Sequence, residues 1–122
     1  MKKLFSFLLA ATSLVGCQSN TEFKSVDAQQ FAEVIANKDV QLVDARTPEE
    51  YSEGHIPGAV NIDVKSADFD TQIATLNPDR PVAVYCRSGR RSKLAAERMT
   101  NAGLQVTELA EGILSWKGEV VK

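Results

Sequence analysis

The sequence contains little cysteine, little histidine and no surplus of positive charge. Its 122 residues include two cysteines, Cys17 and Cys86, and one histidine, His55. Acidic side chains outnumber basic ones by 16 to 14, so the overall charge gives no indication of nucleic-acid binding. We also find no internal repeat and no low-complexity segment. The sequence therefore predicts one domain, without a cofactor, a metal site or a nucleic-acid partner.

A membrane-spanning helix is not indicated either, although the first residues are apolar. Two lysines precede an apolar stretch at 4–11, which is the order of a secretory signal. This stretch is too short and too early to span a membrane. Residues 14–17, Leu-Val-Gly-Cys, resemble the lipobox of bacterial lipoproteins, whose cysteine receives a diacylglycerol thioether before cleavage. The resemblance implies a signal peptide at 1–16, a tether at 17–22 that begins with lipidated Cys17, and a domain at 23–122.

Lipidation of Cys17 would place the protein in the bacterial cell envelope, anchored to a membrane and facing the periplasm. Gln18 follows this cysteine where an aspartate would resemble an inner-membrane retention signal, so we expect the outer membrane if the organism has one. Lipidation would also leave Cys86 as the only free thiol, so no internal disulfide could form. The alternative is an ordinary cleaved signal with Cys17 as a bystander.

Cys86 stands where a predicted strand gives way to a predicted helix. Residues 81–85, Pro-Val-Ala-Val-Tyr, have the β-branched and aromatic character of a buried strand. Apolar positions between 94 and 99 then recur at helical spacing, and Gly103 offers a stop. At such an edge of an α/β sheet, backbone N–H groups and a helix N-terminus form an anion site.

The residues after Cys86 favour a reactive cysteine over one that only packs. Free cysteines are often buried without a function, but arginines would be costly beside a purely apolar cysteine. Nearby positive charge favours the thiolate, which is the nucleophile. Gly89 permits an unusual φ angle, and serines on either side can donate hydrogen bonds or cap the helix. The predicted site comprises Cys86 as the catalytic residue and, as substrate-binding residues, Arg87, Ser88, Gly89, Arg90 and Arg91.

Other local patterns place elements on both sides of this loop. Asp27 with Gln30, and Thr47 with Glu50, form capping-box patterns at the starts of two helices, and Pro48 suits the first position of the second helix. Further predicted elements are strands at 40–43 and 105–109, a strand after the turn at 54–59, a helix at 66–76 and a terminal turn at 112–116. Strands that alternate with helices predict an α/β domain, a mostly parallel sheet covered on both faces.

Three blocks of the sequence resemble the single-domain rhodanese family, in the family's order and with similar spacing between about Val26 and Trp116. The blocks are Leu42-Val43-Asp44-Ala45-Arg46 with Glu50-Tyr51, Gly54-His55-Ile56-Pro57-Gly58-Ala59 with Asn61, and Val84-Tyr85-Cys86-Arg87-Ser88-Gly89-Arg90-Arg91-Ser92. The resemblance implies a rhodanese-like five-stranded sheet flanked by helices. It also implies that Cys86 accepts a sulfane sulfur from thiosulfate or a similar anionic donor and passes it on through a persulfide.

The length of the loop bears on the reaction. The segment from Cys86 through Arg91 has six residues, which resembles the sulfurtransferases, whereas relatives that act on phosphate or arsenate have one residue more. The acceptor stays open: cyanide in vitro, or a thiol. Two alternatives to a monomeric thiosulfate sulfurtransferase also stay open. One is a non-catalytic rhodanese module that binds a partner protein, and the other is an envelope persulfide or redox carrier.

Several other residues could have a functional role, but we expect a structural one. His55 is expected to fix its turn by hydrogen bonds, because displacement by a thiolate needs no histidine base. Asp44, Arg46 and Glu50 are expected to form an ion-pair network at a strand end. Trp116 is expected to pack. Glu111 stands where the family more often shows a glycine, which affects only the turn that follows.

Overall fold

The computed structural model describes residues 22–122. The predicted signal peptide, Cys17 and nearly all of the tether lie outside the described residues. Within the described part, no helix has both the length and the apolar composition that a bilayer crossing requires.

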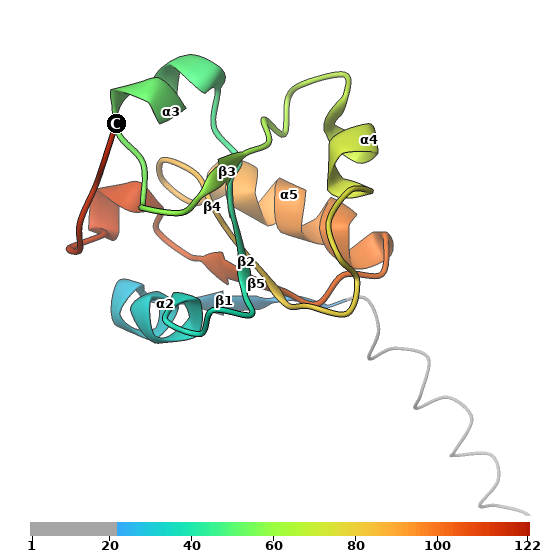
Figure 1. The fold of residues 1–122 in the computed structure, drawn as a ribbon, viewed down its shortest axis with the longest axis horizontal. Coiled ribbons are helices and arrows are strands. Elements are labelled where there is room, and N and C mark those ends of the chain that lie inside the picture. Colours follow the sequence, from blue (N-terminus) through green and yellow to red (C-terminus); the bar gives the residue numbers. More distant parts are fainter. Residues whose placement is uncertain (1–21) are drawn as a thin grey trace, which may run out of the picture.

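The described chain folds around a five-stranded sheet in which every strand pair is parallel (Figure 1). The strands are β1 (Lys24–Val26), β2 (Gln41–Asp44), β3 (Val60–Asn61), β4 (Val82–Tyr85) and β5 (Val106–Leu109). They lie side by side in the order β1-β5-β4-β2-β3. The predicted sheet is therefore confirmed. Because β4 is central, the residue that follows it emerges in the middle of the sheet's carboxyl edge.

Helices cover both faces of this sheet, as predicted. The helices are α2 (Ala28–Ile35), α3 (Pro48–Glu53), α4 (Phe69–Ile73), α5 (Arg90–Asn101) and the 3-10 helix η2 (Ile113–Ser115). Helices α2 and α5 lie on opposite sides of the strands (Figure 1). The α4 and α5 side chains join one apolar cluster, and α2 joins a second cluster with the residues around η2.

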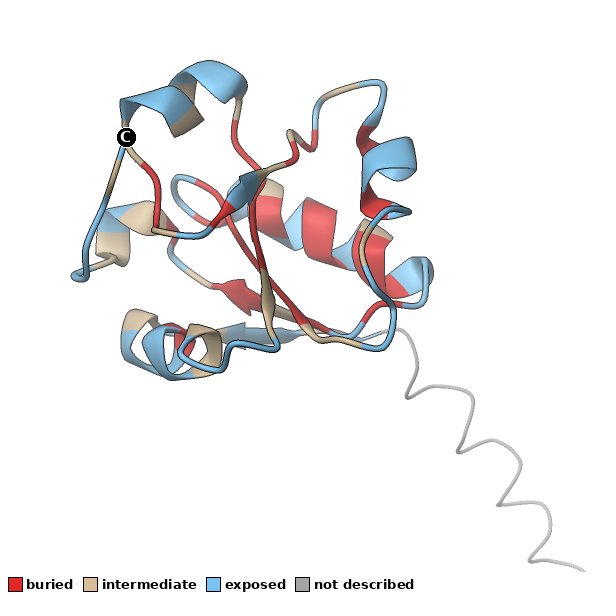
Figure 2. Cartoon of the chain, viewed as in Figure 1, coloured by how far each residue is buried: buried red, intermediate tan, exposed pale blue. Residues whose placement is uncertain are grey.

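Alternation along the strands separates the two clusters. Val82 and Val84 face the α5 side, whereas Ala83 and Tyr85 face the α2 side. All four residues are buried, so β4 is covered on both faces. Figure 2 shows the same arrangement, with buried residues along the strands and on the side of α5 that meets them. The loop after β4 is thus built on the most enclosed strand of the domain.

The two predicted capping boxes are present. Asp27 and Gln30 cap α2 reciprocally, and Thr47 and Glu50 do the same for α3, with Pro48 in its first turn. The helix predicted at 66–76 is shorter, because it begins at Phe69 and ends at Ile73. Before it, the Ser66 hydroxyl accepts the N–H of Asp68 at 3.0 Å, and such local side-chain bonds compete with helical ones.

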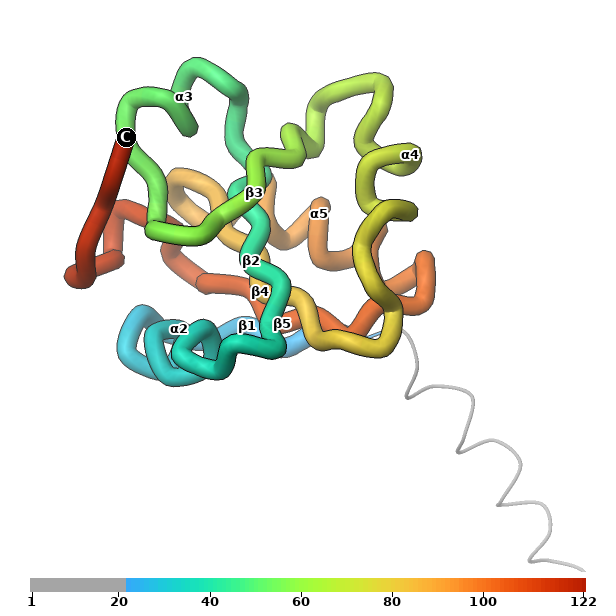
Figure 3. Tube along the Cα trace, in the orientation of Figure 1, coloured from blue at the N-terminus to red at the C-terminus, as the bar shows by residue number. Residues whose placement is uncertain are grey.

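Two tertiary features had no counterpart in the sequence patterns. Strand β1 is an edge strand with exposed residues, and it forms by parallel pairing with β5, with Ser25 opposite Glu108. The chain end returns to α3, where His55 and Val121 exchange two backbone hydrogen bonds of 2.8 Å. Figure 3 shows this return of the C-terminal segment beside α3.

Candidate active site

The sulfur of Cys86 lies at the carboxyl edge of the sheet and is almost enclosed. The residue is 1% exposed. The backbone N–H of Gly89 donates to Cys86 Sγ at 3.1 Å, and Sγ lies 3.5 Å from Ser92 Oγ. Gly89 is the N-cap of α5 with a φ angle of 106°, so the chain turns sharply and brings the start of the helix to the sulfur. The predicted junction of strand, loop and helix is confirmed.

A second turn supports the loop. The N–H of Ile113 donates to the Cys86 carbonyl at 2.9 Å, and the N–H of Leu114 donates to the Arg87 carbonyl at 3.2 Å. Gly112 precedes them with a φ angle of 71°, and a Cβ at this position would overlap the Arg87 carbonyl. Glu111 is exposed, so its departure from the family pattern leaves the turn intact. The loop is thus held from one side by α5 and from another by η2.

A hollow of about 400 Å³ opens beside the loop. Its lining residues are Lys65, Ser88, Arg90, Arg91 and Leu94. Three of these five side chains are cationic, so the hollow favours a small anion. Two predicted site residues do not line this hollow. Gly89 donates its N–H to the Cys86 sulfur, and the Arg87 side chain is exposed to solvent. Lys65 was not predicted, because it follows β3 in an ordinary polar segment and only the fold brings it here.

Arg91 is held by a partner that the sequence analysis assigned elsewhere. Its guanidinium binds the Glu50 carboxylate through two hydrogen bonds of 2.7 and 3.0 Å. The hydrogen bond from Arg91 is the main cause that lowers the pKa of Glu50 to about 2. Glu50 lies on α3 and its carboxylate pairs with Arg91, so the expectation that it joins the ion pair of Asp44 and Arg46 is wrong.

The Glu50–Arg91 pair gives a pH-dependent prediction. Because the pKa of Glu50 falls from its ordinary 4.5 to about 2 on folding, the ion pair stabilises the fold above about pH 4.5 and loses its effect as the pH falls toward 2. Glu50→Gln should lower the free energy of unfolding by about 1–2 kcal/mol at pH 7, allowing for partial exposure. Urea denaturation of Glu50→Gln and of its exposed neighbour Glu49→Gln at pH 7 and pH 2.5 checks this. An equal loss at both pH values would contradict the assignment.

Asp44 and Arg46 form a separate, buried pair under the same edge. Arg46 Nη2 lies 2.7 Å from Asp44 Oδ2, and the same nitrogen donates to the Gly54 carbonyl at 2.7 Å. Burial raises the pKa of the nearby Tyr85 hydroxyl, and the Asp44 charge adds to this effect. The pair thus ties the end of β2 to the turn after α3, which is the structural role expected for Asp44 and Arg46.

His55 also has the structural role that its turn predicts. Its ring stacks on Tyr51 with centroids 3.7 Å apart, and Nδ1 lies 2.9 Å from the Tyr51 carbonyl oxygen. Its backbone is paired with Val121. Trp116 packs edge-to-face on Phe31 with centroids 6.2 Å apart, which confirms that this side chain packs.

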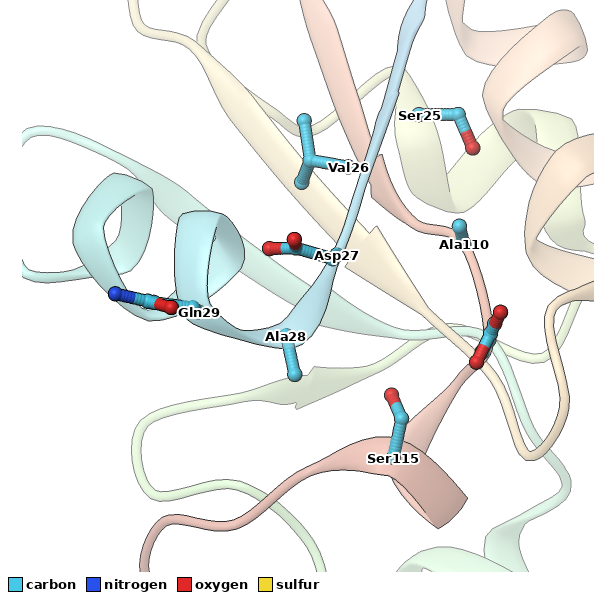
Figure 4. Close-up of a pocket in the computed structure, with 8 residues that line it drawn as sticks. Ser25, Val26, Asp27, Ala28, Gln29, Ala110 and Ser115 are labelled. Atoms are coloured by element: carbon cyan, nitrogen blue, oxygen red, sulfur yellow. The ribbon is translucent and has the colours of Figure 1, made fainter.

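A second hollow has the opposite chemistry. It measures about 370 Å³ and lies between the start of α2 and the residues around η2 (Figure 4). Asp27, Glu111 and the hydroxyls of Ser25 and Ser115 line it, together with Val26, Ala28, Gln29 and Ala110. A hollow lined by carboxylates disfavours the anion that the cationic hollow favours. Of these two hollows, the one beside Ser88 and the arginines therefore suits an anionic substrate.

Glu108 is a second polar residue that the sequence analysis missed, after Lys65. It is fully buried on β5 and accepts hydrogen bonds from Ser92 Oγ at 2.6 Å and Ser25 Oγ at 2.5 Å. Lys93 Nζ lies 3.3 Å from the same carboxylate. One signal was available: strand alternation places position 108 on the same face as Val106, inside the core. A carboxylate thus lies behind the loop, one hydroxyl away from the Cys86 sulfur.

The fold and the site together define a class of α/β domain. In this class, a cysteine at the carboxyl end of a central parallel strand begins a loop that closes on a helix N-terminus. The rhodanese-like domain matches residues 27–119 of the chain. The chain belongs to the rhodanese-like family.

Individual relatives agree with the family. The chain is 34% identical over 99 residues to thiosulfate sulfurtransferase GlpE of Stutzerimonas stutzeri, covering 80% of this chain and 87% of GlpE. It is 38% identical over 97 residues to the HTH-type transcriptional regulator Rv0324 of Mycobacterium tuberculosis, covering 75% of this chain but 42% of that longer protein. A crystal structure of a rhodanese-related protein from Thermoplasma volcanium has a TM-score of 0.72 and 30% identity, covering 81% of this chain and 98% of that one.

Proposed function

We propose that the protein is a sulfurtransferase that moves a sulfane sulfur from thiosulfate, or a similar anionic donor, to a thiophilic acceptor through a persulfide on Cys86. The observation that carries the proposal is the position of Cys86 Sγ, which receives the Gly89 N–H beside a hollow lined by three cations. The thiosulfate sulfurtransferase among the relatives supports this substrate class. The cysteine itself argues against a module that only binds a partner protein.

The first half-reaction is a displacement at sulfur. The Cys86 thiolate attacks the outer sulfur of thiosulfate, a new S–S bond forms, and the S–S bond of the donor breaks. Sulfite leaves with the electron pair of the broken bond. The Gly89 N–H and the start of α5 stabilise negative charge on the enzyme sulfur before and after this transfer, without reorganisation during the reaction.

The second half-reaction releases the sulfur. An acceptor such as cyanide or a thiolate attacks the terminal sulfur of the persulfide, and Cys86 leaves as the thiolate. Two displacements that share a covalent intermediate give ping-pong kinetics. The intact mass of the purified protein, measured before and after thiosulfate and again after cyanide, tests the proposal. We expect a gain of one sulfur that cyanide removes, and a constant mass would overturn the proposal.

The cations of the loop should act mainly on donor binding. Arg90 lines the hollow and Arg87 is exposed nearby, whereas Arg91 is already paired with Glu50. Arg90→Ala should raise the KM for thiosulfate about tenfold or more, since a hydrogen bond to a charged group is worth about 1.5 kcal/mol or more, and Arg87→Ala should raise it less. The loss of a positive charge in either variant should also make the rate less sensitive to salt.

Steady-state kinetics at two salt concentrations check this prediction. Lys38→Ala is the matched control, because Lys38 is an exposed cation in the connection before β2, at the opposite edge of the sheet. An unchanged KM and salt dependence in both arginine variants would show that the loop charges do not bind the donor.

We also propose that acyl chains on Cys17 hold the protein on the periplasmic side of a membrane, in the outer membrane where the organism has one. The Leu-Val-Gly-Cys motif at 14–17 supports this proposal. Two or three acyl chains anchor a protein stably where one does not. Cys17→Ser should move most of the protein to the soluble fraction or block its processing, as immunoblots of fractionated cells would record. Unaltered membrane fractionation and processing would contradict lipidation.

A further inference from the structure

Glu108 lies behind the catalytic loop in a position that β5 and β1 enclose. It is 0% exposed, and β1 places Ser25 directly opposite it in the sheet register. Its Oε1 accepts the Ser25 hydroxyl at 2.5 Å, and its Oε2 accepts the Ser92 hydroxyl at 2.6 Å. Both distances lie within the usual range for a hydroxyl that is hydrogen-bonded to a carboxyl group. The reaction described above assigns no role to this carboxylate.

Ser92 connects Glu108 to the sulfur. Its Oγ lies 2.6 Å from Glu108 Oε2 and 3.5 Å from Cys86 Sγ, and Ser92 itself is fully buried. A serine hydroxyl has a single proton to donate. When that proton points to Glu108, Ser92 Oγ can only accept a proton from the Cys86 thiol. The Gly89 carbonyl, 3.2 Å from Ser92 Oγ, is a further acceptor for this proton. When Cys86 is a thiolate, the Ser92 proton can instead turn to the sulfur, and Glu108 Oε2 can then hold the proton that the sulfur gave up.

We propose that Glu108 takes the proton of the Cys86 thiol through Ser92. In this step the S–H bond of Cys86 breaks and its proton bonds to Ser92 Oγ, while the original Ser92 proton bonds to Glu108 Oε2. The products are a thiolate, an intact serine hydroxyl that donates to it, and a neutral carboxylic acid. No proton leaves the protein and no electron is transferred. Ser92 touches the reacting sulfur, and Glu108 acts through it as a positioning residue.

The groups around Cys86 and Glu108 favour this proton transfer. Cys86 is 1% exposed, so its proton has little direct access to water, and the ring of the only histidine is engaged with Tyr51. Lys93 faces Glu108 from α5, but its ammonium also lies 2.9 Å from the Ala110 carbonyl and keeps that acceptor when Glu108 is neutral. The hydrogen bond to Glu50 is the main cause that raises the pKa of Arg91, and the Cys86 charge adds to this effect.

The other elements around Glu108 bring no competing charge. Val84 of β4 lies opposite it in the sheet register, and Ser25 of β1 contributes a hydroxyl. Burial disfavours an ionised carboxylate over a neutral one, whereas the thiolate gains the Gly89 N–H and the field of the arginines. The transfer therefore moves negative charge from the enclosed interior to the loop that is built to hold it.

This inference rests on the proposed function, because it explains how the nucleophile of that reaction forms. Its test uses no sulfur donor, so a failure here and a failure of sulfur transfer are distinguishable. Infrared spectroscopy of the purified protein at pH 7 detects the C=O stretch of a protonated carboxylic acid, and ultraviolet absorbance detects the thiolate. We expect both signals in the wild-type protein. Glu108→Gln should remove the infrared band, whereas Glu111→Gln, a change at an exposed carboxylate nearby, should leave it.

The decisive variant is Cys86→Ser. A serine at this position does not give up its proton, so Glu108 should become ionised and the infrared band should disappear with the thiolate absorbance. A band that persists in Cys86→Ser would mean that Glu108 is neutral for another reason, and the absence of a band in the wild-type protein would mean that it holds no proton. Either result would overturn the proposal. If Glu108→Gln does not fold, ¹³C labelling of the glutamate carboxyl groups shows whether the band belongs to a glutamate, and Cys86→Ser shows whether it depends on the thiolate.

Ser92 variants test the connection itself. Ser92→Ala should remove the infrared band and slow the alkylation of Cys86 by iodoacetamide at pH 7 about tenfold, the change expected when about 1.4 kcal/mol of thiolate stabilisation is lost. Ser92→Thr keeps a hydroxyl and should restore both signals. A Ser92→Ala variant with the wild-type band would exclude Ser92 as the connection.

Discussion

Replacing Cys86 with serine is expected to abolish sulfur transfer while preserving the fold. The hydroxyl can accept the Gly89 N–H and bond to Ser92, as the sulfur does, so the loop keeps its hydrogen bonds. A serine hydroxyl is a weak nucleophile without an adjacent base, and it forms no persulfide. Turnover of thiosulfate and cyanide should fall at least about a thousandfold, the scale on which loss of a covalent nucleophile acts.

Two measurements check this result. Mass spectrometry should detect no gain of one sulfur after thiosulfate, and colorimetric assay should detect no thiocyanate after cyanide. Cys17→Ser is the matched control, because it removes the other cysteine and should keep both signals. A sulfur gain in purified Cys86→Ser would exclude Cys86 as the carrier.

Substitution of Gly112 is expected to cost both stability and activity, because an added methyl group would meet the backbone of the catalytic loop. Its φ angle of 71° lies in the left-handed region, and a Cβ would overlap the Arg87 carbonyl and crowd the Ser88 N–H. Neither neighbour can yield without opening the loop that carries Cys86. Gly112→Ala should therefore lower the free energy of unfolding by roughly 3 kcal/mol or more and reduce sulfur transfer at least tenfold.

Gly103→Ala separates the cost of the left-handed φ angle from the cost of the overlap with the loop. Gly103 has a φ angle of 96°, but a Cβ there would meet nothing within 4 Å. This variant should lose only about 1–2 kcal/mol, the cost of the left-handed conformation, and should keep full activity. Denaturation curves and kinetics of the two variants give the comparison. Equal losses of stability, with activity unchanged in both, would show that the contact between Gly112 and the loop is unimportant.

Local chemistry made much of the fold predictable. A capping box depends on residues three positions apart, so Asp27 and Thr47 marked two helix starts correctly. The central strand has apolar residues on both faces, and that pattern identified β4 and hence the place of Cys86. The arginines and glycine that follow lie within the same short segment. Their position at one loop required no knowledge of distant contacts.

Long-range contacts were the part that the sequence did not reveal. The Arg91–Glu50 pair joins residues 41 positions apart, and the Ser25–Glu108 bond joins residues 83 positions apart. Strand β1 exists because β5 supplies its hydrogen bonds, and its own residues are mostly exposed. Lys65 likewise reaches the hollow only through the path of the chain after β3. Such pairings depend on the order of strands in the sheet, which local propensity does not encode.

The parallel direction of the strands also determines that Cys86 and the start of the domain lie at opposite edges of the sheet. Strand β1 begins at Lys24 and runs in the same direction as β4, so the chain enters the domain at the edge opposite Cys86. Four strand residues separate the two edges by about 13 Å. A lipid on Cys17, as proposed above, would therefore be attached ahead of the edge of the sheet that lies opposite the catalytic loop.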